Sequence, residues 1–287
     1  MSSSPELSEC EISACNFAIL CDIPFGFYGD TYNCHERAWF APFREKCAFF
    51  LALNEEEARK AKTVFPNAEC VAVGNPLWEE FSFPETTREN VRKDLQVEWD
   101  EILVLAPGSK SAGINIANWT ALLSALYLIK GSKFKVRIAL HPGDVTPHEI
   151  YKEFMQWSPV NVEMTPASMK TSLFVPGADL VAEWNSSIAI EAAHQGIPVI
   201  SLANPFAERR LISTSGSPIW EPCRLRVSVL GSDEPPYLAK QIHALLYEKT
   251  GTALAKRQAI VYPKVLQRGD AVRKMFEYLQ KFMRVSA

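Results

Sequence analysis

The chain has 287 residues, of which 47% are hydrophobic, so it can bury one large core or two medium ones. A formal net charge of −3 excludes a global basic footprint for nucleic acid, although not a local basic patch. No apolar run reaches the roughly 18 residues of a membrane span, and the polar, acidic start of the sequence lacks the features of a signal peptide. We therefore expect a cytoplasmic protein with no integral membrane segment.

The first part of the chain shows three segments that we expect to be strands: Asn16–Asp22, Ala48–Leu53 and Glu69–Val73. Residues 23–34 are rich in Pro, Gly and aromatic residues, which predicts a loop, and residues 35–46 predict a short helix or irregular turn. Asn54 precedes three glutamates, and this pattern is typical of a helix N-terminus.

Residues 77–100 are polar and charged, and we interpret them as a linker with a helix around residues 87–96. Apolar segments that we expect to be strands follow at 102–105, 135–140, 161–164, 179–183, 198–202 and 226–230. Helices are expected between them, at about 115–130, 146–156, 187–195, 235–249 and 252–260, with a last helix at about 270–284. This alternation predicts an α/β fold with a doubly wound parallel sheet covered on both faces.

These patterns suggest four divisions of the chain: a reduced α/β part at 1–76, a linker and helix at 77–100, a Rossmann-like domain at 101–269 and a final helix at 270–287. The first part holds only about three strands. We therefore expect that part to be a shortened domain, which a second copy or a partner chain could complete.

Seven cysteines are present, and none of them forms a Cys-x-x-Cys pair. Zinc sites typically show such spacing, so we expect no metal site. We also expect no cofactor. Free thiols in a reducing compartment are the simplest interpretation of these cysteines.

Three polar turns follow strands of the second part and could meet at one edge of its sheet. The first turn is glycine-rich and contains Gly108, Ser109, Lys110 and Ser111. It matches neither the P-loop nor the Gly-x-Gly-x-x-Gly fingerprint. Ligands bind at the carboxyl edge of such sheets, so the turn is a candidate anion site, although an ordinary β–α turn would have the same composition.

The other two turns begin at His141 and at Trp184. The second of them, Trp184 to Ser187, includes Asn185 and Ser186 and leads into a helix that carries Glu191. Hydroxyl groups followed by a carboxylate suggest a nucleotide diphosphate with its ribose. Asn and Ser are also ordinary helix caps, and a single histidine is often only structural, so both interpretations stay open here.

In the first part, Asp22 is expected to end a buried strand, and Asp30 and His35 follow on a loop. Each is a candidate general base for an acceptor hydroxyl, and Asp22 has the most rigid expected position. Loops are commonly polar, so these residues could equally be solvated surface groups.

Three segments together resemble the GT-B glycosyltransferase superfamily, notably lipid-A-disaccharide synthase, MurG-type transferases and non-hydrolysing UDP-N-acetylglucosamine 2-epimerases. They are Val73-Gly74-Asn75-Pro76-Leu77, Leu105 to Lys110, and the block from Ala178 through Glu191 to Val199. The resemblance spans about residues 40–285. The chain departs from this superfamily in two ways. The turn at 108–111 lacks the His and Arg residues that the epimerases have there, and the first part is about a hundred residues shorter than the usual N-terminal domain.

The resemblance implies a glycosyltransferase that uses a nucleotide sugar, with UDP as the expected nucleotide, and an acceptor hydroxyl bound by the first part. Ser186 and Ser187 would then meet the diphosphate, Glu191 the ribose, and the turn at 108–111 the phosphates or sugar. The final helix would cross back to the first part. The alternatives are a nucleotide-sugar epimerase or hydrolase, and an inactive nucleotide-binding module. The acceptor is not indicated.

Overall fold

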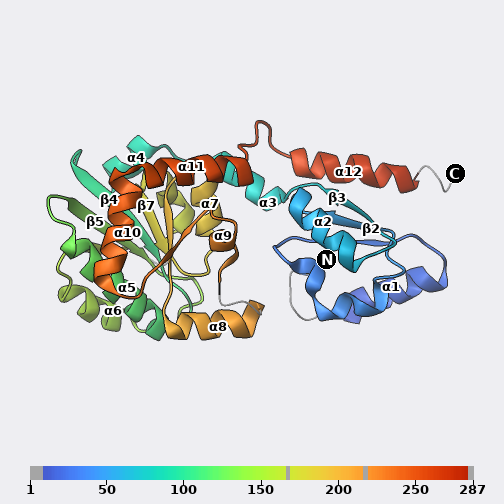
Figure 1. Ribbon diagram of the computed structural model, residues 1–287, viewed down its shortest axis with the longest axis horizontal. Coiled ribbons are helices and arrows are strands. Elements are labelled where there is room, and N and C mark those ends of the chain that lie inside the picture. The colour runs from blue at the N-terminus through green and yellow to red at the C-terminus, as the bar shows by residue number, and fades with distance from the viewer. Residues whose placement is uncertain (1–8, 166–168, 216–218, 284–287) are drawn as a thin grey trace. The chain divides into compact units, whose positions relative to one another are not determined.

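The computed structural model describes residues 9–165, 169–215 and 219–283. The chain divides into two compact units (Figure 1): the first is Met1–Glu80 with Val265–Ala287, and the second is Phe81–Lys264. Each unit has a parallel sheet, of three and six strands respectively. Among the described residues, no helix is both long and apolar enough to cross a bilayer.

The sheet of the first unit has the order β1-β2-β3, formed by Gly26–Tyr28, Phe49–Ala52 and Glu69–Ala72. Its α-helices are α1 (Glu9–Leu20), α2 (Glu55–Val64), α3 (Pro76–Glu79) and α12 (Asp270–Met283). Two 3₁₀ helices, Cys34–Glu36 and Ala38–Phe43, occupy the region expected to be a short helix or turn. The expected cap of α2 is confirmed, because the Asn54 side chain accepts the Glu57 amide at 2.9 Å.

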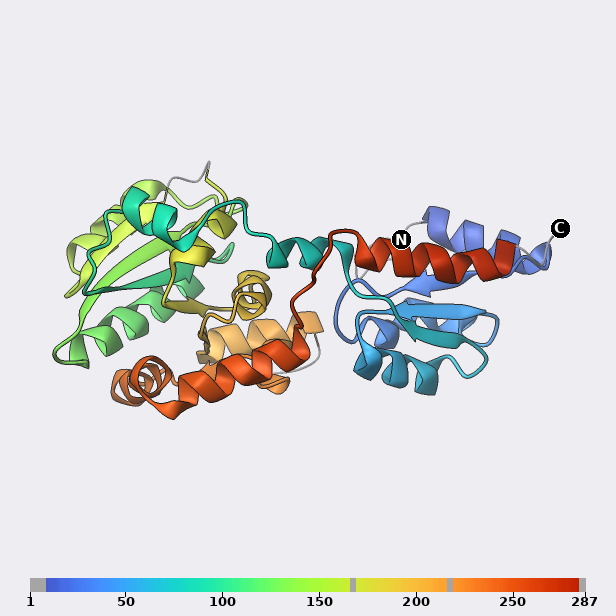
Figure 2. The ribbon, with the colours of Figure 1, turned by 90° about the horizontal axis from the view of Figure 1, so that it is seen from above.

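The core of the first unit is largely aromatic and includes Phe27, Phe40, Phe43, Phe50 and Phe65. A second cluster joins the sheet to α12, the red helix of Figure 2, through Leu51, Val73 and Tyr278. The Tyr278 hydroxyl also donates a hydrogen bond to Glu69 on β3 at 2.9 Å. Helix α12 thus belongs to the first unit by packing, although it ends the chain.

The strand expected at residues 16–22 is wrong. Those residues complete helix α1 and the turn after it, where Asp22 is exposed and has a φ of 53°. The helix buries only the small side chains of Cys15 and Ala18, while Leu20 is 84% exposed. The apolar run therefore faces solvent, and β1 lies instead in the segment that was expected to be a loop.

The second unit confirms the expected parallel sheet, with the order β6-β5-β4-β7-β8-β9. In chain order, the strands are Glu101–Pro107, Lys133–Ala139, Asn161–Thr165, Leu180–Glu183, Val199–Leu202 and Val229–Gly231. The first strand, β4, is central, and the direction of winding reverses between β4 and β7. Ligands of doubly wound sheets bind outside the carboxyl ends of the strands at such a reversal.

Helices cover both faces of this sheet. Successive side chains of β4 point to opposite faces, so they pack in two different hydrophobic clusters. Val104 and Ala106 belong to the cluster under α5 (Ala112–Leu128) and α10 (Pro235–Tyr247). Leu103 and Leu105 belong to the cluster under α4 (Arg88–Asp94) and α7 (Ile188–His194). The remaining helices are α6 (His148–Gln156), α8 (Pro205–Ser215), α9 (Glu221–Arg224), α11 (Lys249–Val261) and the 3₁₀ helices Glu80–Ser82 and Thr171–Gly177.

The helix expected within residues 77–100 is α4, and ion pairs dock it on the second unit. Arg92 donates to Asp179 at 2.8 Å, and Arg88 pairs with the same carboxylate. Asp179 also accepts the amide of Leu103 on β4 at 2.8 Å. This polar stretch is therefore ordered by its ion pairs to Asp179, the partly buried residue just before β7, which its composition alone did not reveal.

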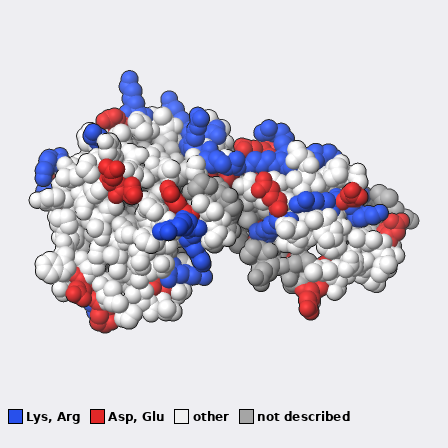
Figure 3. Space-filling view, turned by 60° about the horizontal axis from the view of Figure 1, so that its bottom comes forward, with Lys and Arg blue, Asp and Glu red and all other residues white. Residues whose placement is uncertain are grey.

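Basic and acidic side chains both lie on the face shown in Figure 3. Acidic groups lie among the basic ones there, and most of that surface is uncharged. This distribution agrees with the small net charge of the chain.

Candidate functional site

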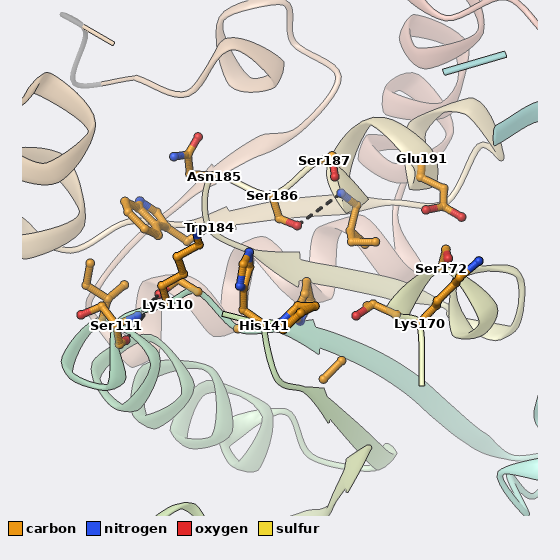
Figure 4. A pocket seen from close by; sticks show the side chains of 18 of the residues that line it. Lys110, Ser111, His141, Lys170, Ser172, Trp184, Asn185, Ser186, Ser187 and Glu191 are labelled. Atoms are coloured by element: carbon orange, nitrogen blue, oxygen red, sulfur yellow. Dashed lines mark hydrogen bonds between the residues drawn. The ribbon is translucent and has the colours of Figure 1, made fainter. Parts of the chain in front are cut away.

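A cavity of about 960 Å³ lies at the carboxyl ends of the central strands of the second unit (Figure 4). Its volume is within the range of about 300–1,000 Å³ that is usual for small-molecule sites. All nine residues predicted to bind a nucleotide sugar line it: Gly108, Ser109, Lys110, Ser111, His141, Asn185, Ser186, Ser187 and Glu191. The three polar turns thus meet at one place, while the ligand they hold stays a prediction.

The turn between β4 and α5 is shaped by Asn115, a buried residue one turn into the helix. Its side-chain oxygen accepts the Ser109 amide at 2.7 Å and the Ser109 hydroxyl at 2.9 Å. The Ser109 hydroxyl oxygen in turn accepts the Ser111 amide at 3.1 Å. Both donors of Ser109 thus have partners within the protein, and these hydrogen bonds shape the turn, while contact of Ser109 with a ligand stays a prediction.

The start of helix α5 is left open toward the cavity. Ser111 stands at its N-cap position without a side-chain cap hydrogen bond. The first amides of a helix have no partner inside the helix, and they carry its positive dipole end. Lys110 and Ser111, which both line the cavity, stand immediately before these amides.

The loop after β5 carries His141 and is held by a carboxylate. Asp144 accepts hydrogen bonds from the Thr146 amide at 2.9 Å and from the Tyr151 hydroxyl at 2.7 Å. Burial alone would raise the pKa of Asp144, but these hydrogen bonds together lower it below its usual value. The His141 ring also accepts the Gly143 amide at 2.9 Å, so the imidazole is oriented by its own loop.

The turn after β7 is fixed from beneath by Glu183, the last residue of that strand. Asn185 adopts a left-handed φ of 50°, and the next amide, of Ser186, donates to Glu183 at 2.8 Å. The other carboxylate oxygen accepts the Ser201 hydroxyl. Glu183, a strand residue without solvent exposure, thus holds the backbone of the turn at Ser186.

Burial raises the pKa of Glu183 from 4.5 to about 7, against the lowering effect of its two hydrogen bonds. The folded protein therefore holds this proton more tightly than the unfolded chain between about pH 4.5 and pH 7. Across that window this group makes stability fall as the pH rises, by about 3 kcal/mol in total.

Replacement of Glu183 by glutamine should remove this contribution and flatten the pH dependence of stability. Urea unfolding of E183Q and the parent protein at pH 5 and pH 8 measures the difference. E149Q, at an exposed glutamate of α6, is the matched control and should keep the parent profile. Equal pH profiles for E183Q and the parent protein would contradict the assignment.

Glu191 places a second buried carboxyl group in the wall of the cavity. It is 5% exposed and lies on α7. Burial, with a smaller effect of Glu85, raises the pKa of Glu191 to about 7. Figure 4 shows Glu191 at the same end of the cavity as Lys170 and Ser172, with Lys110 and Trp184 at the other end.

Several cavity residues were not singled out as site residues from the sequence. Lys170, Ser172 and Arg210 add two cations and a hydroxyl group, and Phe81 and Trp184 add aromatic surface. Arg210 lies on α8, a helix that the sequence pattern did not predict. Lys170 and Arg210 are distant in sequence from the glycine-rich turn, so their position beside it in the cavity depends on the fold.

The three candidate bases belong to the first unit and have different surroundings. Asp22 is exposed in the turn after α1, so the rigid strand that favoured it is absent. Asp30 is partly buried, and its carboxylate lies 3.8 Å from Arg37. His35 lies in the 3₁₀ helix Cys34–Glu36, where it is 2% exposed and its ring lies 3.5 Å from Glu57.

Glu57 is the buried polar partner of His35 in the first unit. Burial alone would raise the pKa of Glu57, but hydrogen bonds from His35, Lys60 and the Asn33 amide lower it to about 2. A carboxylate that stays ionised in the core requires such partners. His35 is therefore part of a buried polar cluster of the first unit.

Across residues 9–165, 169–215 and 219–283, no three His, Cys, Asp or Glu side chains form a group that could hold a metal ion. The cavity wall instead combines hydroxyl groups, cations, helix amides and one buried carboxyl group. This chemistry suits an anionic, hydroxyl-bearing organic ligand.

No protein-family model matches the chain, and no curated protein sequence matches it. Solved structures do match it in three dimensions. The UDP-GlcNAc 2-epimerase from Neisseria meningitidis, bound to UDP-GlcNAc, is 15% identical with a TM-score of 0.60, over 94% of this chain and 73% of that one.

A glycosyltransferase from Rickettsia africae ESF-5 is 10% identical with a TM-score of 0.54, over 99% of this chain and 84% of that one. Anabaena Alr3699/HepE in complex with UDP is 14% identical with a TM-score of 0.55, over 95% and 76% of the two chains. Likenesses at such low identity show the fold alone. That fold is the one the sequence resemblance predicted: the chain has a GT-B-like fold, with two α/β units built on parallel sheets.

Proposed function

We propose that the protein is a glycosyltransferase that binds a UDP-sugar in the cavity of the second unit and transfers the sugar to an acceptor hydroxyl. The observation that carries the proposal is the convergence, at the sheet's winding reversal, of an open helix N-terminus, cationic side chains and a buried carboxyl group. The first two favour a diphosphate, and the third favours ribose hydroxyls.

The ends of the cavity suggest how such a ligand lies. Glu191 would accept hydrogen bonds from the ribose, and Ser186 and Ser187 would meet the diphosphate beside it. The sugar would then point toward the end where Lys110 and Trp184 lie (Figure 4). Two of the similar structures hold UDP or UDP-GlcNAc, which supports this class of ligand.

Transfer requires charge stabilisation on the leaving diphosphate as the bond to the sugar breaks. The open amides of α5 and the ammonium group of Lys110 would supply it without reorganisation. Inverting transfer also needs a base for the acceptor hydroxyl, and Asp22, Asp30 and His35 are the proposed candidates. A retaining enzyme would need no such base.

Turnover of D22N, D30N and H35Q tests the base assignment. A loss of roughly 10²-fold or more in one variant, with UDP-sugar affinity intact, identifies the general base. Near-normal turnover in all three would remove the first-unit candidates. Circular dichroism is needed for H35Q, because the variant also disturbs the buried contact to Glu57.

Incubation with a panel of UDP-sugars, with and without acceptors, distinguishes the classes of function. Release of UDP only with an acceptor supports a transferase. An altered sugar on the nucleotide supports an epimerase, which the fold match to a UDP-GlcNAc 2-epimerase keeps as second candidate. Release of UDP in water supports a hydrolase, and binding without turnover supports an inactive binding module.

A further inference from the structure

A buried hydrogen-bond network joins two of the three turns beneath the cavity. Its centre is Asn115, 2% exposed, whose side-chain NH₂ group lies 3.1 Å from the Tyr151 hydroxyl and 3.2 Å from Asp144. The same group donates to the Ser109 carbonyl at 3.0 Å, and Tyr151 donates to Asp144 at 2.7 Å. The side-chain amide of Asn115 thus contacts both the turn after β4 and the loop after β5.

Asn115 also fixes the position of Ser109 in the first turn. Its side-chain oxygen takes both the amide and the hydroxyl proton of Ser109. Ser111, at the N-cap position, makes no side-chain cap hydrogen bond, so the first amides of α5 lie beside this fixed turn without a cap from it.

We propose that Asn115 is a positioning residue for diphosphate binding: it holds the Lys110 turn through Ser109 and the His141 loop through Asp144, and so keeps the two in one fixed arrangement beside the N-terminus of α5. This inference rests on the proposed function, because it assigns the support of the same site. A diphosphate that bridges the two turns would meet groups that need no reordering on binding.

The close packing around the turn supports a positioning role. Tyr151 has 0% exposure and contacts the Trp119 ring at a centroid distance of 5.4 Å. A Cβ atom at Gly108 would lie 3.1 Å from Trp119 and 3.3 Å from the Asn115 amide, so the backbone must approach these side chains closely. Loss of the Asn115 side chain removes the contacts that hold this backbone in place.

The first test compares N115A with Q258A, a matched truncation of a buried amide. Gln258 has 0% exposure, donates to two backbone carbonyls at 3.0 Å and does not line the cavity. Both variants should lower the urea midpoint of unfolding. Calorimetry should show that N115A weakens UDP binding by roughly tenfold or more, whereas Q258A leaves it unchanged.

The second test exchanges the amide and the carboxylate. N115D puts two carboxylates about 3 Å apart and should bind UDP more weakly than the parent protein. N115D/D144N restores one amide–carboxylate pair with the original net charge and should recover at least several-fold of the lost affinity. A merely structural role would not produce this recovery in ligand affinity at equal fold stability.

The outcomes separate the two claims. If the parent protein binds UDP and N115A binds it equally well, the positioning role is overturned while the nucleotide site stands. If the double variant binds no better than N115D, the link through Asp144 is overturned. If the parent protein binds neither UDP nor UDP-sugars, the proposed function fails, and the inference fails with it.

Discussion

Replacement of Glu191 by alanine is expected to weaken UDP-sugar binding by roughly 1.5–3 kcal/mol, because hydrogen bonds from ribose hydroxyls to a carboxylate are charge-assisted. Glu191 is the proposed ribose acceptor at one end of the cavity, and it is almost fully buried. Titration calorimetry of E191A and the parent protein measures the loss, with E149Q as a surface control.

The raised pKa of Glu191 also predicts that the affinity for a UDP-sugar depends on pH. With a pKa of about 7, the side chain gains its charge between about pH 6 and pH 8. The ionised form accepts hydroxyl protons most strongly, so this group makes affinity rise with pH across that window. E191Q should lack this component. Unchanged affinity in folded E191A, or equal pH profiles for E191Q and the parent protein, would remove Glu191 from the ligand site.

Replacement of Trp119 by alanine is expected to destabilise the protein by about 3–5 kcal/mol, the range for deletion of a buried aromatic side chain. Trp119 is 2% exposed within the cluster under α5 and contacts both Tyr151 and Phe154. The loss leaves a cavity directly behind the Gly108 turn.

Urea unfolding of W119A and W99A measures this effect with a matched control, since Trp99 is 92% exposed. W99A should change stability by no more than about 0.5 kcal/mol. Equal effects of the two substitutions would contradict the packing described for α5.

The sheet of the second unit was predictable from the sequence because each strand is a short apolar run that ends in a polar turn. Residues 102–105, expected as a strand, lie within β4, which pairs in parallel with β5 and with β7. Parallel strands place their carboxyl ends at one edge. The pattern therefore indicated that Gly108, His141 and Ser186 would lie together.

Tertiary contacts decided what the sequence pattern could not predict. The run from Asn16 to Asp22 is as apolar as a buried strand, yet its large side chains face solvent on α1. Arg210 reaches the cavity only because α8 follows β8 there. The hydrogen bonds of Ser109 to Asn115 were also not predictable, because the spacing of the two residues alone does not show that their side chains meet.

A crystal structure of the protein with a UDP-sugar would show where the nucleotide binds. We expect electron density for the nucleotide in the cavity of the second unit, with the ribose at Glu191 and the diphosphate between the α5 N-terminus and Ser186. A nucleotide bound elsewhere, or an empty cavity at saturating UDP-sugar, would contradict this expectation.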